Sequence, residues 1–150
     1  MLSRIKRIKI IALILLALKT GIMMSQEITD HRWKNRVLLV FTQDINAPNF
    51  KKQIDELKKN EKGLKNRKLI IYQIAKDSFR TGFTNLKWEK TPNSFVNFKD
   101  KNSTFSIVLI GLDGGIKLKQ KRFLSCIDLF NIIDVMPMRQ QEIMDNTKSK

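Results

Sequence analysis

Cysteine and histidine are almost absent from this sequence, which has one of each in 150 residues. A single cysteine excludes an internal disulfide, and one cysteine with one histidine excludes a cysteine-rich zinc module. The chain is also too short for several domains of ordinary size. Hydrophobic residues still make up 42% of it. That share is enough to form one core, so a globally disordered chain is excluded as well.

No apolar run is long enough to cross a membrane as a helix. The longest, Ile10 to Leu18, has nine residues, whereas a spanning helix needs about 20. Four basic residues precede this run: Arg4, Lys6, Arg7 and Lys9. A basic start, a short apolar run and a segment ending at Ser25 are the three parts of a secretory signal peptide. We predict a signal peptide over residues 1–25, a periplasmic or secreted bacterial chain beginning near Gln26, and no transmembrane anchor after processing.

Acidic residues are few compared with basic ones. The chain has 29 Lys and Arg against 14 Asp and Glu, and loss of the five basic residues in the signal segment lowers the net charge from +15 to +10. Such a charge suits a phosphate polymer or an anionic membrane face. However, 21 of the basic residues are Lys and only 8 are Arg, and Arg is the residue preferred for phosphate and base recognition. We expect no nucleic-acid partner, although an electrostatic binder of anionic lipid, lipopolysaccharide or nucleic acid stays open as an alternative.

A strand, a helix and a second strand are indicated in the first half of the mature chain. The run Val37 to Phe41 is apolar and β-branched, as in a strand buried on both faces. Pro48 opens an amphipathic helix, with Asn46 as its cap and Gly63 as its end. A second apolar run over residues 68–75 completes a right-handed parallel unit.

A hairpin and a closing helix are indicated in the second half. Residues 105–111 form a strand, the turn at 113–115 has the sequence Asp-Gly-Gly, and residues 116–120 form the return strand. Ser125 caps a closing helix that Pro137 ends.

The order of these elements predicts the fold. Between the second strand and the hairpin, the residues 76–104 indicate only a short helix near Phe95 to Phe98. Strand, helix, strand, long connection, hairpin and closing helix is the order of the thioredoxin fold. We predict an α/β chain, a thioredoxin-like βαβ unit followed by a β-hairpin and a closing helix. It forms one domain over residues 26–150 with its core at about 33–143.

Four motifs narrow this prediction to a family. They are Trp33-Lys34-Asn35-Arg36, Gly63-Leu64 with Arg67, the glycine hairpin from Leu109 to Leu118, and Asp134 to Arg139 with its Met-Pro-Met-Arg ending. Together they resemble the bacterial family called domain of unknown function 4174, from about Trp33 to Ile143. That family is similar to a thioredoxin-like domain of vertebrate extracellular sushi-repeat and matrix proteins. The resemblance implies the fold and an exported setting, and it implies no activity.

The residues of thioredoxin catalysis are missing. Thioredoxin-like enzymes have a Cys-x-x-Cys motif where the central strand meets the next helix, and residues 42–48 contain no thiol. Residues 102–104 stand where those enzymes have a cis-proline, and none of them is proline. We therefore predict no ordinary disulfide exchange or peroxide reduction, no cofactor and no metal. Cys126 is interpreted as a core residue and His31 as a solvated loop residue.

Gln43, Asp44 and Asn46 are predicted to line the cleft that the catalytic residues have left, and to hold a peptide, a small ligand or an envelope protein there. Arg139 is a further ligand-binding candidate, because it lies outside any apolar stripe, and a bridge to Asp134 would explain it too. The favoured interpretation is a non-catalytic binding or accessory module of the cell envelope. An enzyme of unfamiliar type, using weak thiol or acid/base chemistry, stays open as an alternative. The sequence names neither the ligand nor the oligomeric state.

Overall fold

The apolar run near Val37 forms β1 (Arg36–Thr42), the central strand of the sheet. In the computed structural model, which describes residues 28–148, all seven residues of β1 are buried. The strand pairs in parallel with β2 (Leu69–Ala75) and antiparallel with β5 (Phe105–Ile110). A strand with neighbours on both sides and packed side chains on both faces has no polar positions to expose. The prediction of a central strand here is confirmed.

The sheet has six strands in the order β4-β3-β2-β1-β5-β6. Beyond β2 lie β3 (Ser78–Thr81) and β4 (Glu89–Lys90), which the sequence did not indicate because such short strands show no clear alternation. On the other side, β6 (Ile116–Gln120) is the predicted return strand, which pairs with β5 and forms the edge of the sheet. The hairpin between them turns at Gly114, whose φ of +82° is a left-handed conformation that costs glycine no steric strain.

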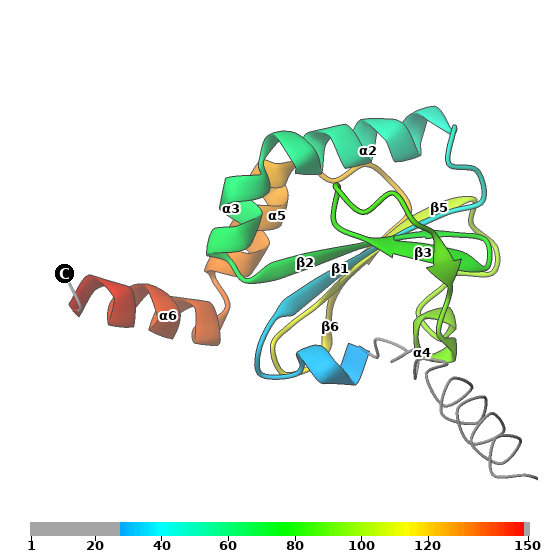
Figure 1. The fold of residues 1–150 in the computed structure, drawn as a ribbon. Helices are drawn as coiled ribbons and strands as arrows, with labels where there is room; N and C mark the ends of the chain where they lie inside the picture. The colour runs from blue at the N-terminus through cyan, green and yellow to red at the C-terminus, as the bar shows by residue number, and fades with distance from the viewer. Residues whose placement is uncertain (1–27, 149–150) are drawn as a thin grey trace, which may run out of the picture.

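Helices cover the two faces of the sheet unequally (Figure 1). One face carries α2 (Pro48–Lys59), α3 (Glu61–Asn66) and α5 (Cys126–Asp134), and the other carries η1 (Ile28–His31) and α4 (Asn93–Val96). The larger hydrophobic core lies under the first three helices and includes Leu38, Leu57 and Leu129. A second core on the opposite face includes Leu39 and Phe95. Because successive side chains of a strand point to opposite faces, β1 contributes to both cores.

Two details of the helix after β1 differ from the sequence prediction. Asn46 does not cap it, because α2 begins after Ala47 with no side-chain cap. The backbone N–H of Asn46 donates instead to the Asp44 carboxylate at 2.8 Å, and Pro48 at the first helical position has no N–H to be capped. Gly63 does not end the helix either, since it lies inside α3. A Cβ at Gly63 would be 2.7 Å from Cζ of Phe130, so this glycine permits α3 to approach α5 closely.

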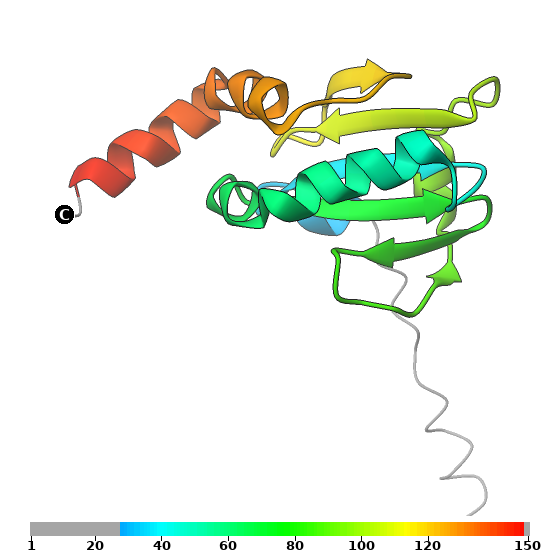
Figure 2. The same cartoon turned by 90° about the horizontal axis from the view of Figure 1, so that it is seen from above.

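The closing helix is followed by a further helix. Ser125 caps α5 as predicted, and its Oγ accepts a hydrogen bond from the backbone N–H of Asp128 at 3.1 Å. The closing helix ends just before Pro137, as predicted, since α5 stops at Asp134. Pro137 is also the first residue of a further helix that the sequence did not indicate, α6 (Pro137–Lys148). Proline suits that position because the first N–H groups of a helix have no partner within it. α6 extends away from the sheet (Figures 1 and 2).

The predicted signal peptide lies outside the described residues. Within residues 28–148, none of the helices combines the length and apolar character needed to span a membrane.

Candidate functional site

The predicted cleft is a shallow hollow at the carboxyl end of β1. Gln43 and Asp44 line it on one side and residues 75–78 on the other, and its volume is about 410 Å³. Asn46 lies two residues after Asp44, and its backbone N–H donates a hydrogen bond to the Asp44 carboxylate. No cis peptide bond occurs in the described part of the chain. This end of the sheet has neither a thiol nor a cis-proline, as the sequence indicated.

Cys126 is a core residue, as predicted. Its side chain is buried beneath α2, where the thiol donates to the Glu56 carbonyl with Sγ 3.6 Å from the oxygen. Burial, followed by the charge of the Glu56 carboxylate, raises the pKa of the thiol to about 11. A thiol with such a pKa is almost entirely protonated at neutral pH and is a poor nucleophile.

His31 is not a solvated loop residue, so that prediction is wrong. It lies in η1, partly buried, with Nε2 2.6 Å from the hydroxyl of Tyr72. Burial lowers the pKa of His31 and raises the pKa of Tyr72 to about 12. Tyr72 in turn packs on the rings of Phe79 and Phe95, so His31 covers an aromatic core. Among residues 28–148, no group of three or more His, Cys, Asp and Glu side chains is placed to hold a metal ion.

Arginine side chains form a network at the opposite end of β1. Arg36 is the first residue of the strand, and its side chain is only 1% exposed. Its Nη1 donates to the carbonyl of Arg67 at 2.9 Å and to both carboxylate oxygens of Glu142 at 3.2 Å. One guanidinium thus links β1, the residue that follows α3, and α6.

Arg139 belongs to the same network and is also buried. Its Nε donates to Asp134 at 3.2 Å, and its Nη1 donates to the carbonyl of Asn66 at 3.0 Å and to Glu142 at 3.1 Å. Arg67 reaches Asp134 as well, through Nε at 3.0 Å. The interpretation of Arg139 as a bridge to Asp134 is confirmed. Its bonds fasten α6 to α3 and α5.

The four predicted ligand-binding residues therefore do not meet in one site. Gln43, Asp44 and Asn46 follow the carboxyl end of β1. Arg139 lies at the amino end of that strand, beside the Glu142 carboxylate that binds Arg36.

Two carboxylates hold the arginine network together. Burial by itself would raise the pKa of Asp134, but hydrogen bonds from Arg67 and Arg139 outweigh it and hold the pKa below its ordinary value. The pKa of Glu142 is lowered in the same way, against the effect of burial, by Arg139 and the neighbouring cations. Four cations face these two carboxylates: Arg36, Arg67, Lys68 and Arg139. Positive charge is therefore in excess within this network.

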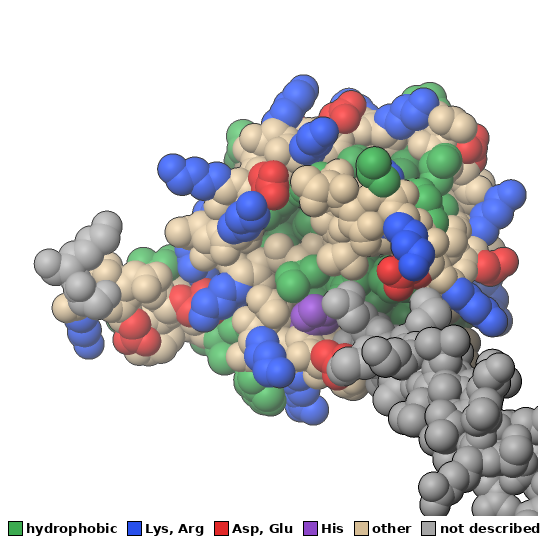
Figure 3. Space-filling view, in the orientation of Figure 1, with side chains coloured by type: hydrophobic (Ala, Val, Ile, Leu, Met, Phe, Trp, Pro, Cys, Tyr) green, Lys and Arg blue, Asp and Glu red, His purple; other side chains and the backbone are tan. Residues whose placement is uncertain are grey.

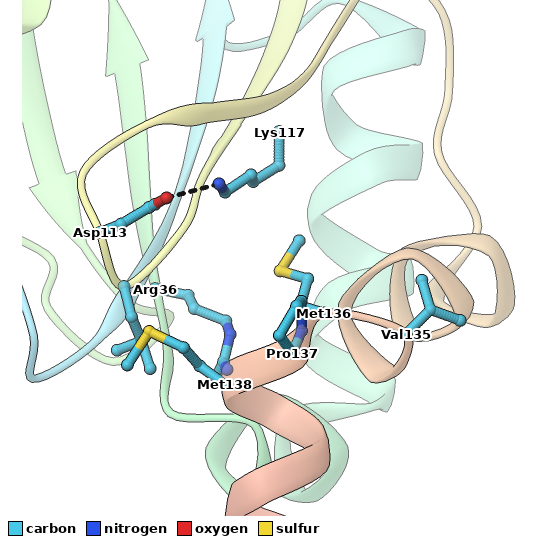
Figure 4. Close-up of a pocket in the computed structure, with 8 residues that line it drawn as sticks. Arg36, Asp113, Lys117, Val135, Met136, Pro137 and Met138 are labelled. Carbon is cyan, nitrogen blue, oxygen red and sulfur yellow. Dashed lines mark hydrogen bonds and ion pairs between the residues drawn. The ribbon is translucent and has the colours of Figure 1, made fainter.

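A pocket of about 440 Å³ opens beside the network (Figure 4). Its walls are Arg36, Leu112, Asp113, Lys117 and the four residues from Val135 to Met138. On one side, Lys117 is paired with Asp113 at 2.7 Å. On another, the Arg36 side chain extends from β1 toward Pro137 and Met138 at the start of α6.

Arg36, one of the residues that line this pocket, has two nitrogens without hydrogen-bond partners among the described residues. They are Nε and Nη2, and both are buried. A buried polar group without a partner is rare in folded proteins, and the cost is greatest when the group is charged. The sequence did not assign a function to Arg36. Two features of the sequence could have pointed to Arg36: it directly precedes a fully apolar strand, and it belongs to one of the four motifs.

A comparison with protein families identifies the family of this chain. The model of a family described as Domain of unknown function (DUF4174) matches residues 27–142. The chain belongs to this family. The four motifs by which it resembles DUF4174 supply all residues of the pocket wall and four residues of the arginine network, Arg36, Arg67, Asp134 and Arg139. Lys68 and Glu142 of the network lie outside these motifs.

Comparison with solved structures shows the fold. The chain is similar to the structure titled "Crystal Structure of Plasmodium vivax 2-Cys Peroxiredoxin, Reduced", with a TM-score of 0.53 and 17% identity over 75% of this chain and 83% of that chain. The peroxiredoxin has a thioredoxin-like fold, so the predicted fold class of this DUF4174 chain is confirmed. Among curated proteins there is no match.

Proposed function

We propose that this DUF4174 chain is an exported, non-catalytic binding module of the cell envelope, and that it binds its ligand in the pocket beside Arg36. The observation that carries the proposal is the buried guanidinium of Arg36, a residue of the pocket wall, which has two nitrogens without hydrogen-bond partners in the described part of the chain. A ligand group that accepts their hydrogen bonds would remove the cost of leaving them unpaired. The hollow at Gln43 and Asp44 offers no buried donor of this kind.

The state of the thiol supports binding rather than redox catalysis. Cys126 is the one cysteine of the chain, and it is buried with a raised pKa. Thiol catalysis needs an accessible thiolate. Reduction of insulin disulfides by the protein should therefore be no faster than by its Cys126→Ser variant, and a rate that falls on this substitution would contradict the non-catalytic assignment.

The positive charge alone is a weaker basis for function. On the face shown in Figure 3, Lys and Arg side chains are dispersed and interspersed with Asp and Glu, instead of forming one basic patch. Charge spread in this way favours solubility and weak, salt-sensitive attraction. Retention that disappears at moderate salt would identify such attraction.

The test is retention of a ligand from envelope extract by the immobilised full-length protein, at low and at moderate salt. Val135→Trp fills the pocket from an exposed position, since Val135 is 76% exposed. Ile127→Trp is the matched control, because Ile127 lies in α5, the helix that ends directly before Val135, is 73% exposed and does not line the pocket. We expect the wild type and Ile127→Trp to retain the same species at both salts and Val135→Trp to lose it.

A second variant separates the two ends of the sheet. Alanine at Gln43, Asp44 and Asn46 together should leave this retention unchanged. Loss of retention in that variant, with retention kept in Val135→Trp, would place the ligand at the carboxyl end of β1 and contradict the pocket assignment.

A further inference from the structure

The free edge of the Arg36 guanidinium has a defined shape. An arginine side chain carries five N–H donors in one rigid plane. Nη1 is occupied by the Arg67 carbonyl and by Glu142. The donors that remain are on Nε and Nη2, which form one side of the guanidinium. The N–H groups along this side are parallel and match the two oxygens of a carboxylate.

The charge around this edge favours an anion. In the ion-pair network of the described chain, four cationic side chains share the carboxylates of Asp134 and Glu142. α6 also begins at the pocket wall and has no acidic residue in its first turn. The amino end of a helix carries partial positive charge. A bound carboxylate would thus offset charge that the protein leaves uncompensated.

The remaining walls of the pocket favour a ligand whose body is apolar. Its other walls are mostly apolar, formed by Leu112, Val135, Met136, Pro137 and Met138. A carboxylate presents two oxygens to the two donors. The additional oxygens of a phosphate would face mostly apolar side chains, because Lys117, the other cation of the pocket wall, is already paired with Asp113 at 2.7 Å. The volume of about 440 Å³ falls in the range of small-ligand pockets, roughly 300–1,000 Å³.

We propose that this pocket binds a carboxylic acid with a small apolar body, its carboxylate held by Nε and Nη2 of Arg36. The inference rests on the proposed binding function and adds the chemical class of the ligand. Arg36 Nε and Nη2 are covered in the structure, so a side chain must move to admit the carboxylate. Met138 is suited to this because it lies beside Arg36 at the pocket wall, is 41% exposed and is unbranched.

The experiment is calorimetric titration of the full-length protein with four probes: hexanoate, hexanamide, hexyl phosphate and acetate. Hexanoate should bind at one site, about tenfold or more tightly than hexanamide, because a charge-assisted pair of hydrogen bonds is lost with the amide. Hexyl phosphate and acetate should also bind more weakly. In NMR spectra, hexanoate should shift the Nε–H resonance of Arg36, which a purely apolar contact elsewhere would not do.

Three variants accompany the titration. Arg36→Lys removes the paired donors and keeps the charge, and Val135→Trp fills the pocket without altering the arginine network. Lys119→Met is the control, because it removes one positive charge from the neighbouring edge strand β6 outside the pocket. Hexanoate affinity should fall about tenfold or more in the first two variants and stay within about twofold in the third, a change of under 0.5 kcal/mol.

An acetylated peptide ending in leucine, with a free carboxylate or with a terminal amide, shows whether the acid is a chain end or a free molecule. A preference for the free carboxylate over the amide supports the proposal in either case. Equal binding of hexanoate and hexanamide, or tighter binding of hexyl phosphate, would overturn the carboxylate assignment. If the probes overturn the carboxylate assignment but Val135→Trp fails to retain the species that the wild type retains from extract, the binding function stands and only the ligand class is wrong. If no probe binds and Val135→Trp retains what the wild type retains, both proposals fail.

Discussion

Gly63 leaves room for an aromatic ring between two helices. A Cβ at this position would lie 2.7 Å from Cζ and 2.8 Å from Cε2 of Phe130. Arg67, one helical turn further on, stacks over the same ring at 3.8 Å. The glycine of this motif is therefore required by packing, and the helix continues through it.

Whether alanine at Gly63 raises or lowers the stability of the protein should depend on the side chain at Phe130. Alanine ordinarily stabilises a helix by about 1 kcal/mol over glycine, but overpacking a core costs roughly 1–3 kcal/mol. We expect Gly63→Ala to lower the free energy of unfolding, measured in urea. In a Phe130→Leu background, where the two crowding ring atoms are gone, the same substitution should be neutral or stabilising. Destabilisation of equal size in both backgrounds would show that the ring is not the cause.

The sequence predicted the contacts of side chains whose partners are close in the chain, and it missed contacts between residues far apart in the chain. The Ser125 cap needs only Asp128, three residues away, and was predicted. His31 pairs with Tyr72, 41 residues away, and Arg36 pairs with Glu142, 106 residues away. Such pairings depend on the register of β1 and the direction of α6, which local patterns do not fix. Arg139 was noticed because it fitted no local pattern, and its partner Asp134 is only five residues away.

At the scale of elements, α6 is held to the body by charged contacts more than by apolar ones. Arg139 is its one buried residue among those the structure describes. Glu142, on the next turn, binds Arg36 and Arg139. The anchorage of α6 therefore depends on ionised Asp134 and Glu142.

Acid should release α6. The pKa values of Asp134 and Glu142 are lowered in the folded protein, so these carboxylates add stability above the ordinary carboxyl pKa of about 4. That contribution is lost as the pH falls through their lowered folded values. Amide hydrogen exchange in residues 137–148 should accelerate sharply, relative to β1, between pH 6 and pH 3 after correction for the intrinsic rate.

The control for this prediction is the double variant Asp134→Asn and Glu142→Gln, which cannot titrate at these positions. Its α6 amides should exchange rapidly at both pH values. Protection of α6 that is equal at pH 6 and pH 3 in the wild type would mean that other contacts hold the helix.

Elements with a long apolar stretch or a distinct turn sequence were predictable, and short strands defined only by their pairing were not. β1, β2 and β5 each bury a continuous apolar run, and α5 has a cap and an apolar face. β3 and β4 are short, and they are strands only because β3 pairs with β2 and β4 pairs with β3. Pro137 indicated the end of α5, but the same proline also begins α6, and no apolar stripe in the sequence indicated that second helix.

At the scale of the whole molecule, the two ends of β1 differ. The carboxyl end, where thioredoxin-like enzymes have their thiols, has an open hollow lined by Gln43 and Asp44. The amino end has the buried arginines, the excess positive charge and the pocket. The order of elements was enough to predict the fold. The fold in turn suggested a site at the carboxyl end of β1, because thioredoxin-like enzymes have their thiols there. The pocket could not be predicted from the sequence, because four separate segments of the chain form its walls.

Export is the remaining prediction for the whole chain, and it bears on the state of Cys126. When the full-length chain is produced in a bacterium, intact-mass measurement of the envelope fraction should give a protein beginning near Gln26. Leu15→Arg, which interrupts the nine-residue apolar run, should leave the precursor uncleaved in the cytoplasm. An uncleaved chain in the envelope fraction would contradict the signal peptide. Because Cys126 is buried, the exported protein should also stay free of disulfide-linked dimers in an oxidising compartment, and non-reducing electrophoresis of the same sample checks this.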